Sequence, residues 1–303
     1  MTNSDTPKII LVTGASGFIG RRLVKELLHR GYRVRCMDRH PASQPEGAEQ
    51  VLADLLKPET LPAALAGVHT AYYLVHSMGA GGGDFAEMDR RAASSFVSAA
   101  EAAGVKRVIY LGGLGESADN LSHHLASRLE VAGILQKGTF STTFLRAAVI
   151  IGSGGASYEM VKSLVERLPV MITPRWVNTR SQPIAVADVI AYLAGCLEQE
   201  KTCNGTFDIG GPDILTYREM MERFAAVTGR RLLIIPVPVL TPRLSSYWVG
   251  LVTPIKSAIA IALISGLKNE VICRDNAIRE LVPIELASYD DAIKTALAEK
   301  QKT

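Results

Sequence analysis

The sequence has few cysteines, which argues against a zinc-binding domain and against a small disulfide-bonded domain. The four cysteines among its 303 residues, Cys36, Cys196, Cys203 and Cys273, form no Cys-x-x-Cys pair. Because their spacing fits neither a zinc site nor a disulfide framework, we expect no bound metal. The apolar run after "MTNSDTPK" is too short for a secretory signal and meets a glycine turn at once. These absences predict a protein of the reducing cytoplasm.

The sequence also lacks a block of like charge and a long unbroken apolar run. With 33 basic and 30 acidic side chains and no basic cluster, it predicts no nucleic-acid partner. The most apolar late stretch, 249–267, contains Pro254 and Lys256, which argues against a membrane-spanning helix of about 20 apolar residues. We interpret it as packing within a lobe. The alternative is contact with a membrane surface or a protein partner through residues 247–267.

What the sequence does contain is an alternation of short apolar runs and amphipathic patterns. A helical pattern at 19–28 is closed by Gly31, and another at 85–103 is closed by Gly104. The alternation of strand and helix patterns predicts an α/β fold. Specifically, it predicts a Rossmann fold, a doubly wound parallel sheet with right-handed crossovers. The expected strands are 9–12, 32–37, 51–53, 71–75, 108–111 and 143–145.

The pattern changes after the first half of the chain. We expect residues 1–155 to form the Rossmann domain, with strands near 183–186 and 205–210 rejoining it. Residues 156–303 are expected to form a smaller C-terminal lobe for substrate or partner. Within this lobe, Thr216 and Glu219 have the spacing of a capping box, which predicts a helix that ends before Gly229.

Three glycines follow the first apolar run, at 14, 17 and 20 in "ILVTGASGFIG". Between a strand and a helix, they allow a tight turn, close approach of backbone to a pyrophosphate, and close packing of helix on sheet. The alternative is a glycine-rich turn without a ligand. A second strand ends at Asp38, 18 residues beyond Gly20, where an acid accepts hydrogen bonds from ribose hydroxyls. This context predicts a dinucleotide, NAD or NADP.

Two further residues bear on the choice of dinucleotide. Arg39 could pair with the 2'-phosphate of NADP, whereas Asp38 would repel it, so the sequence favours NAD. Asp54 ends the third strand in "LADL", where it could accept from the adenine amino group or simply cap a helix.

With these motifs the chain resembles the short-chain dehydrogenase/reductase superfamily, in its extended and atypical members. Thr13 to Gly20 carries Thr-Gly-x-x-Gly-x-x-Gly, and "AGVKRVIYLGGLG", "FLRAAVIIGSG", "QPIAVADV" and "FDIGGPDILTYREMM" match the NmrA-like or NAD-dependent epimerase/dehydratase-like branch. The resemblance implies a bound NAD(P) and, less firmly, oxidoreductase or epimerase chemistry. The expected cofactor-binding residues are Thr13, Gly14, Ser16, Gly17, Phe18, Ile19, Gly20, Asp38, Arg39, Asp54, Leu55, Leu74, Val75, His76 and Arg128.

The family's catalytic pattern is a Ser after the strand at 108–111 and then Tyr-x-x-x-Lys on the next helix. Here the Ser position falls on Gly112 or Gly113, and the pair falls on His124 and Arg128. One interpretation is that His124 transfers a proton while Arg128 holds ribose hydroxyls. The other is that catalysis is lost, Arg128 only anchors the cofactor, and His124 lines the pocket.

Other polar residues lie where a ligand is expected. His76 follows the fourth strand and is a candidate for cofactor contact and for catalysis. Arg146 ends a strand near the cleft, where structural pairing and substrate binding are equally plausible. The loop residues Arg175, Trp176 and Arg180 could contact an anionic or ring-shaped substrate, or could simply belong to a surface loop.

Two functions remain open at this level. The first is an NAD(P)-dependent oxidoreductase or epimerase acting on an unidentified small molecule. The second, implied by NmrA-like redox sensors and the accessory subunit of respiratory complex I, is a non-catalytic redox sensor or an assembly or regulatory factor. The resemblance also implies a possible homodimer through the long helices beside the sheet.

Overall fold

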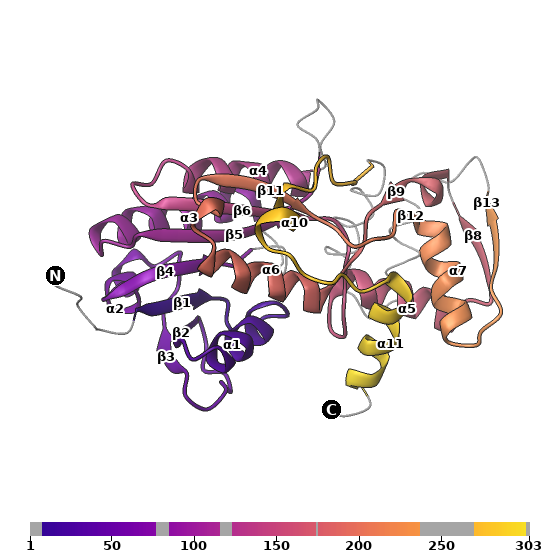
Figure 1. Ribbon diagram of the computed structural model, residues 1–303, viewed down its shortest axis with the longest axis horizontal. Helices are drawn as coiled ribbons and strands as arrows, with labels where there is room; N and C mark the ends of the chain where they lie inside the picture. Colours follow the sequence, from indigo (N-terminus) through magenta and orange to yellow (C-terminus); the bar gives the residue numbers. More distant parts are fainter. Residues whose placement is uncertain (1–7, 77–84, 116–122, 174, 237–269, 301–303) are drawn as a thin grey trace.

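A seven-stranded parallel sheet forms the larger part of the molecule (Figure 1). The computed structural model describes residues 8–76, 85–115, 123–173, 175–236 and 270–300. The strand order is β3-β2-β1-β4-β5-β6-β11, and all neighbouring pairs are parallel. The strands are β1 (Ile9–Thr13), β2 (Arg33–Asp38), β3 (Glu49–Leu52), β4 (Val68–Tyr73), β5 (Arg107–Gly113), β6 (Ser141–Ala147) and β11 (Gly205–Ile209).

The predicted α/β fold is therefore confirmed. The central strands are buried on both faces, so their sequences are nearly continuous apolar runs and are easily recognised. Strand order reverses at β1, which pairs with β2 on one side and β4 on the other. In an open sheet of this kind, such a reversal leaves a crevice at the carboxyl ends of the strands, where ligands bind.

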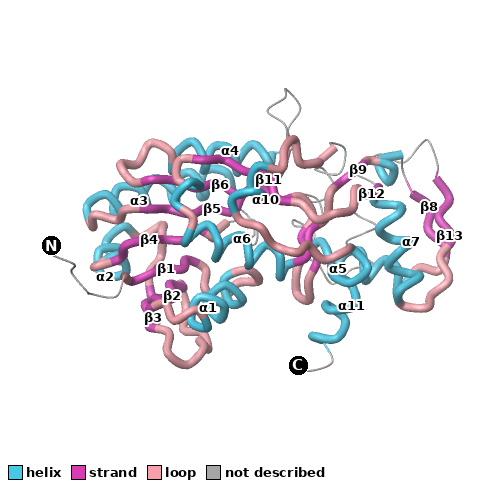
Figure 2. The backbone as a smooth tube through the Cα atoms, in the orientation of Figure 1, coloured by secondary structure: helices cyan, strands magenta, loops and turns pink. Residues whose placement is uncertain are grey.

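Helices cover both faces of the sheet (Figure 2). On one face lie α1 (Gly20–His29), α6 (Val186–Glu198) and α10 (Ala277–Leu281), and their apolar side chains share one core with the sheet. On the other face lie α2 (Leu61–Leu65), α3 (Phe85–Ala102) and α4 (His123–Leu135), around a second core. None of the helices within the described ranges has the length and apolarity needed to cross a membrane.

A smaller lobe extends from the carboxyl-end side of the sheet (Figure 1). Its own core lies between α5 (Ala156–Arg167), α7 (Tyr217–Val227) and α11 (Tyr289–Lys300). The predicted capping box starts α7: Thr216 Oγ1 accepts from the Glu219 N–H at 3.1 Å, and Glu219 Oε2 accepts from the Thr216 N–H at 2.7 Å. Short strand pairs complete the lobe: β8 (Val170–Thr173) with β13 (Leu233–Pro236), and β9 (Arg180–Ser181) with β12 (Leu215–Thr216).

The two later strands join the Rossmann part in different ways. We expected strands near 183–186 and 205–210 to rejoin that domain, and β11 does so as the edge strand beside β6. The other strand, β10 (Ile184–Ala185), pairs in parallel with β7 (Ile150–Ile151) outside the seven-stranded sheet, while Ile184 belongs to the core that the sheet shares with α1, α6 and α10.

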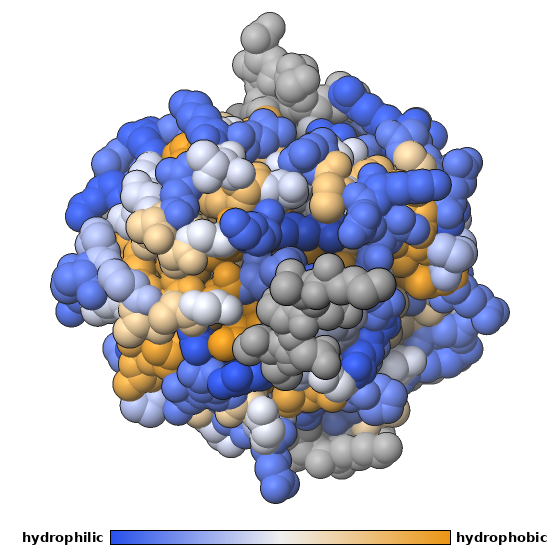
Figure 3. Space-filling model, turned by 60° about the vertical axis from the view of Figure 1, so that its left-hand side comes forward, coloured by the Kyte–Doolittle hydropathy of each residue, from blue (hydrophilic) through white to orange (hydrophobic). Residues whose placement is uncertain are grey.

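The surface around the sheet is mixed in polarity. Figure 3 views one side of the molecule, on which hydrophilic side chains predominate and hydrophobic ones form smaller groups between them. Scattered apolar residues of this kind are normal on protein surfaces and do not by themselves indicate a binding site.

We expect Gly20→Ala to destabilise the protein by about 1 to 3 kcal/mol through overpacking. A Cβ at this position would overlap the Gly14 carbonyl oxygen and lie 2.8 Å from Ala15 Cα. Gly133→Ala in α4 is the matched control, since its Cβ would meet nothing within 4 Å and the change should be neutral or slightly stabilising. Urea unfolding measures both, and a Gly20→Ala chain as stable as the parent would contradict the close packing.

Candidate functional site

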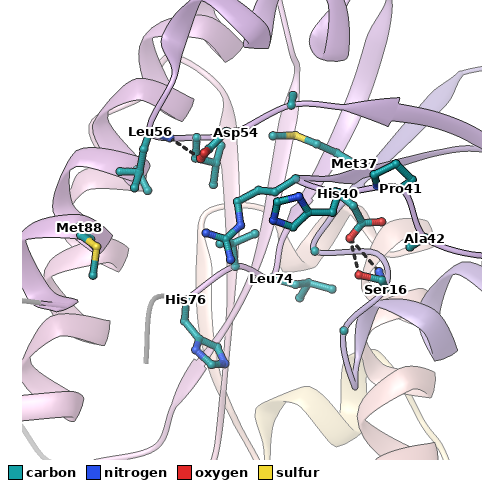
Figure 4. A pocket seen from close by; sticks show the side chains of 18 residues that line it. Ser16, Met37, His40, Pro41, Ala42, Asp54, Leu56, Leu74, His76 and Met88 are labelled. Carbon is teal, nitrogen blue, oxygen red and sulfur yellow. Dashed lines mark hydrogen bonds between the residues drawn. The ribbon is translucent and has the colours of Figure 1, made fainter. Parts of the chain in front are cut away.

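A pocket of about 460 Å³ opens where the order of the strands reverses (Figure 4). It lies at the carboxyl ends of β1, β2 and β4, with the loop after β3 and one turn of α3 as further walls. Most of the residues expected to bind the cofactor line it: Gly14, Ser16, Gly17, Asp38, Arg39, Asp54, Leu55, Leu74, Val75 and His76. These expected residues thus lie around one pocket, and their contact with a cofactor stays a prediction.

The glycine turn keeps the backbone open toward this pocket. Gly14 has a φ of +65°, a conformation that disfavours any side chain, and its N–H bonds to the Met37 carbonyl at 2.9 Å. At the end of the turn, no acceptor among the described residues bonds the backbone N–H of Phe18 or Ile19. Both groups precede α1, whose N-terminus adds a partial positive charge. This arrangement fits a pyrophosphate.

Asp38 connects the turn to the end of β2. Its side chain is 7% exposed, and its Oδ1 accepts from the Ser16 N–H at 3.0 Å and from the Ser16 hydroxyl at 2.7 Å (Figure 4). Its Oδ2 accepts from the Gln44 amide at 2.8 Å. A carboxylate can accept about four hydrogen bonds, so one acceptor site remains for a ribose hydroxyl. Gln44 was not among the expected residues, because its loop carries no motif.

The adenine end of the pocket has polar walls. Arg39 and His40 are exposed at the rim, next to Asp38. Asp54 lines the pocket, and its Oδ1 accepts from the Leu56 N–H at 3.0 Å, which caps the turn that follows; its expected bond to the adenine amino group stays a prediction.

Some expected cofactor residues support the pocket without lining it. Thr13 is fully buried; its hydroxyl donates to the Tyr72 carbonyl at 3.0 Å and accepts from the Leu74 N–H at 3.0 Å. It thus joins β1 to β4 and fixes Leu74 at the pocket wall. The Phe18 ring packs under the Arg22 guanidinium, 4.7 Å from its centroid, and Gly20 allows α1 to approach the turn.

Comparison with known proteins agrees with this geometry. Residues 14–168, just over half of the chain, match the family described as NAD(P)H-binding. The chain belongs to this NAD(P)H-binding family.

Curated relatives of the chain differ in what their names say they do. Divinyl chlorophyllide a 8-vinyl-reductase of Zea mays is 29% identical over 250 residues, 76% of this chain and 62% of the reductase. The chain thus spans less than two thirds of that protein. Photosystem II assembly factor Ycf39 of Trieres chinensis is 24% identical over 273 residues, 86% of this chain and 83% of the factor. Reductases and an assembly factor are therefore both among the relatives.

Solved structures share the fold over nearly the whole chain. Triphenylmethane reductase of Citrobacter sp., complexed with NADP(H), has a TM-score of 0.76 at 20% identity and covers 95% of this chain and 99% of its own. A short-chain dehydrogenase/reductase superfamily protein of Agrobacterium tumefaciens with bound NAD has a TM-score of 0.71 at 18% identity. The match covers 97% of this chain and 98% of the other. Both dinucleotides occur among these neighbours.

The two superfamily catalytic positions lie on α4. His124 is in its first turn, and its side chain is outside the described part of the structure. Arg128, one turn later, is half-buried; its Nη1 donates to the Tyr110 hydroxyl at 3.5 Å, and that hydroxyl donates to the Arg128 carbonyl at 3.3 Å. Here Arg128 lines a separate pocket of about 200 Å³ beside β5, so its expected contact with the cofactor ribose stays a prediction.

Tyr110 does not replace the missing tyrosine. Burial raises the pKa of its hydroxyl, and the nearby Arg128 guanidinium offsets only part of this effect. A tyrosine with a raised pKa stays protonated at neutral pH, which is the opposite of the activation that a general base needs.

The other candidate residues have varied surroundings. His76 is exposed at the carboxyl end of β4 and lines the cofactor pocket. Arg146 pairs with the fully buried carboxylate of Asp208 at 2.6 Å, which supports a structural role. Arg180 pairs with Glu270 on the surface. The side chains of Arg175 and Trp176 lie outside the described part of the structure.

The Tyr-x-x-x-Lys spacing does occur once, at Tyr158 and Lys162, and sequence reasoning missed it. Both residues lie on α5 in the smaller lobe, where Tyr158 is fully buried and Lys162 is 6% exposed. Tyr158 packs on Phe224, and burial raises its pKa. The pair thus belongs to the core of the lobe.

We expect Tyr158→Phe to increase the free energy of unfolding by about 1 kcal/mol, because the buried hydroxyl has no hydrogen-bond partner among the described residues. Tyr289→Phe in the same core is the matched control. Its hydroxyl donates to the Met220 carbonyl at 3.0 Å, so its removal should cost about 1 kcal/mol. Thermal and urea unfolding measure the change in the free energy of unfolding of each variant. A clear loss of stability in Tyr158→Phe would show that this hydroxyl is hydrogen-bonded and would contradict the prediction.

Proposed function

We propose that the protein is an NAD(P)H-dependent reductase of a small molecule. The observation that carries the proposal is the pocket at the reversal of strand order, with a glycine turn and two N–H groups at a helix N-terminus that no described residue bonds. A bound NAD(P)H would supply a hydride from its dihydronicotinamide and would become NAD(P)+. Two similar proteins, from Zea mays and Citrobacter sp., are reductases by name.

Net reduction is proposed ahead of epimerisation because the two similar proteins named above are reductases. The superfamily uses an activated tyrosine for proton transfer, and here that position holds His124. Near neutral pH its imidazolium form can give a proton to the reduced product and become neutral imidazole, which is the role we propose for it. Arg128 is the proposed holder of the nicotinamide ribose, through a movement away from Tyr110.

We further propose NAD(H) as the preferred dinucleotide. The Asp38 carboxylate is held at the pocket by Ser16 and Gln44, and its charge opposes a 2'-phosphate. Arg39 at the rim is the residue that would favour NADP(H). The cytoplasmic location and a homodimer stay predictions from the sequence.

The reductase proposal is tested by deuteride transfer. The protein is incubated with C4-deuterated NADH or NADPH and a metabolite extract, and mass spectrometry identifies any labelled small molecule. His124→Ala is expected to slow labelling by about 100-fold or more, the usual contribution of a positioned proton donor. His29→Ala, an exposed histidine at the end of α1, is the control and should retain full labelling.

A different outcome would favour the second candidate function. Dinucleotide binding without any labelled product would contradict the reductase proposal and support a sensor or an assembly factor. That candidate is supported by similarity to the assembly factor of Trieres chinensis over 86% of this chain. It predicts that binding of a partner depends on the oxidation state of the dinucleotide.

Cofactor preference is tested with Asp38→Asn. The amide removes the charge but keeps an oxygen that can accept from Ser16, so affinity for NADPH relative to NADH should rise at least about tenfold, or about 1.4 kcal/mol. Fluorescence titration with each dinucleotide gives the ratio. Asp54→Asn is the control, because it removes an equal charge from the pocket wall away from the ribose position. An unchanged ratio in Asp38→Asn would contradict the proposed preference.

A further inference from the structure

The smaller lobe ends in an apolar sheet face that faces away from its core. The strands β8 and β13 pair in parallel, with Val170 opposite Leu233 and Ile172 opposite Ile235. Figure 1 shows them at the end of the molecule farthest from the N-terminus. Because side chains alternate along a strand, each strand presents one set inward and the other outward.

The inner set is packed and the outer set is not. Met171 and Ile234 point into the core of the lobe and are 1% and 5% exposed. The outer set consists of four aliphatic side chains, which we call the strand face: Val170 (51% exposed), Ile172 (57%), Leu233 (56%) and Ile235 (43%). A sheet with one solvated face normally carries polar residues there, so an apolar outer set requires an explanation.

Cations gather at one end of the strand face. The strands are parallel, so the residues preceding them lie at the same end: Arg167 before β8, and Arg230 and Arg231 before β13. The three side chains are exposed, and Arg230 Nη1 donates to the Glu166 carbonyl at 3.1 Å. Glu166 precedes β8 as well, and its carboxylate lies 3.9 Å from Lys162 Nζ. The two strand segments, 165–173 and 229–236, contain three arginines and one acid, a net charge of +2.

We propose that the strand face and its three arginines dock the protein on an anionic lipid surface. Aliphatic side chains enter the boundary between headgroups and acyl chains, and the adjacent arginines meet lipid phosphates. The sequence that follows β13 is also basic: residues 237–269 contain Arg243, Lys256 and Lys268 and no Asp or Glu. Residues 247–267, for which the sequence predicted contact with a membrane or partner, lie outside the described residues.

A protein partner fits this surface less well. A specific protein interface buries about 800 Å² on each partner and is enriched in aromatic residues. The strand face has four half-exposed aliphatic residues and no aromatic one. Its small area and positive border suit a surface that offers both apolar depth and dense negative charge.

The test is flotation of the full-length protein with vesicles. We expect binding to phosphatidylcholine vesicles that contain phosphatidylglycerol, and much weaker binding to phosphatidylcholine alone. Ile172→Thr, which keeps a β-branched side chain, should weaken binding about tenfold through lost apolar burial. Leu52→Thr in β3, also half exposed and in a strand, is the matched control and should bind as the parent does.

A second variant tests the contribution of the arginines to vesicle binding. Arg231→Gln should weaken binding about fivefold, the effect of one cation near an anionic surface, and the difference should vanish at 1 M salt, where the Debye length is about 3 Å. Dinucleotide affinity and the melting temperature verify that each variant is folded.

Three results would overturn the proposal. The first is a parent protein that does not bind the anionic vesicles. The second is equal binding by the parent and Ile172→Thr, which would assign membrane contact to another part of the chain. The third is self-association in light scattering that Ile172→Thr abolishes without any vesicle binding, which would make the strand face a contact between copies.

Discussion

The site depends on one close approach, that of Gly20 at the start of α1 to the Gly14 carbonyl in the turn after β1. No side chain fits at position 20, because the Cβ would overlap the backbone of the turn. This contact brings the N-terminus of α1 directly over the carboxyl end of β1. The N–H groups of Phe18 and Ile19, which no described residue bonds, lie at this N-terminus, and Ser16 reaches the Asp38 carboxylate. The phosphate and ribose ends of the site are thus fixed by one packing contact.

The sheet holds this contact in place from below. Thr13 ties β1 to β4 through two hydrogen bonds, with the Tyr72 carbonyl and the Leu74 N–H, and Gly14 bonds to the end of β2. The turn is therefore attached to both neighbours of β1 at the point where strand order reverses. Since β1, β2 and β4 are buried on both faces, opening the pocket wall would disturb two cores at once. Because the turn is already held by the sheet, binding of a dinucleotide there would not carry the entropic cost of ordering this turn.

The sequence predicted those features whose cause is local. Buried strands show as apolar runs, the α7 capping box as Thr216 and Glu219, and the phosphate turn as three glycines. It did not predict features that depend on long-range pairing. The strand at 183–186 was expected, but its pairing with β7 outside the seven-stranded sheet was not. Gln44 reaches Asp38 from a loop without a motif, and the buried Tyr158 and Lys162 share the spacing of a catalytic pair without its position.

The two halves of the site differ in how strongly the fold constrains them. Dinucleotide binding uses backbone N–H groups and glycines, so it persists only while the turn and α1 keep their geometry. The proton transfer that we propose would use side chains on α4, where His124 and Arg128 stand at the positions of Tyr and Lys without altering strand order or core. Side chains at such positions can change while the pocket stays intact, because neither core depends on their chemistry. Proteins named as reductases, an epimerase and an assembly factor all resemble this chain. In this chain the geometry of the pocket is set by the glycine turn and α1, so a change of the side chains on α4 would need no change in the residues that line the dinucleotide pocket.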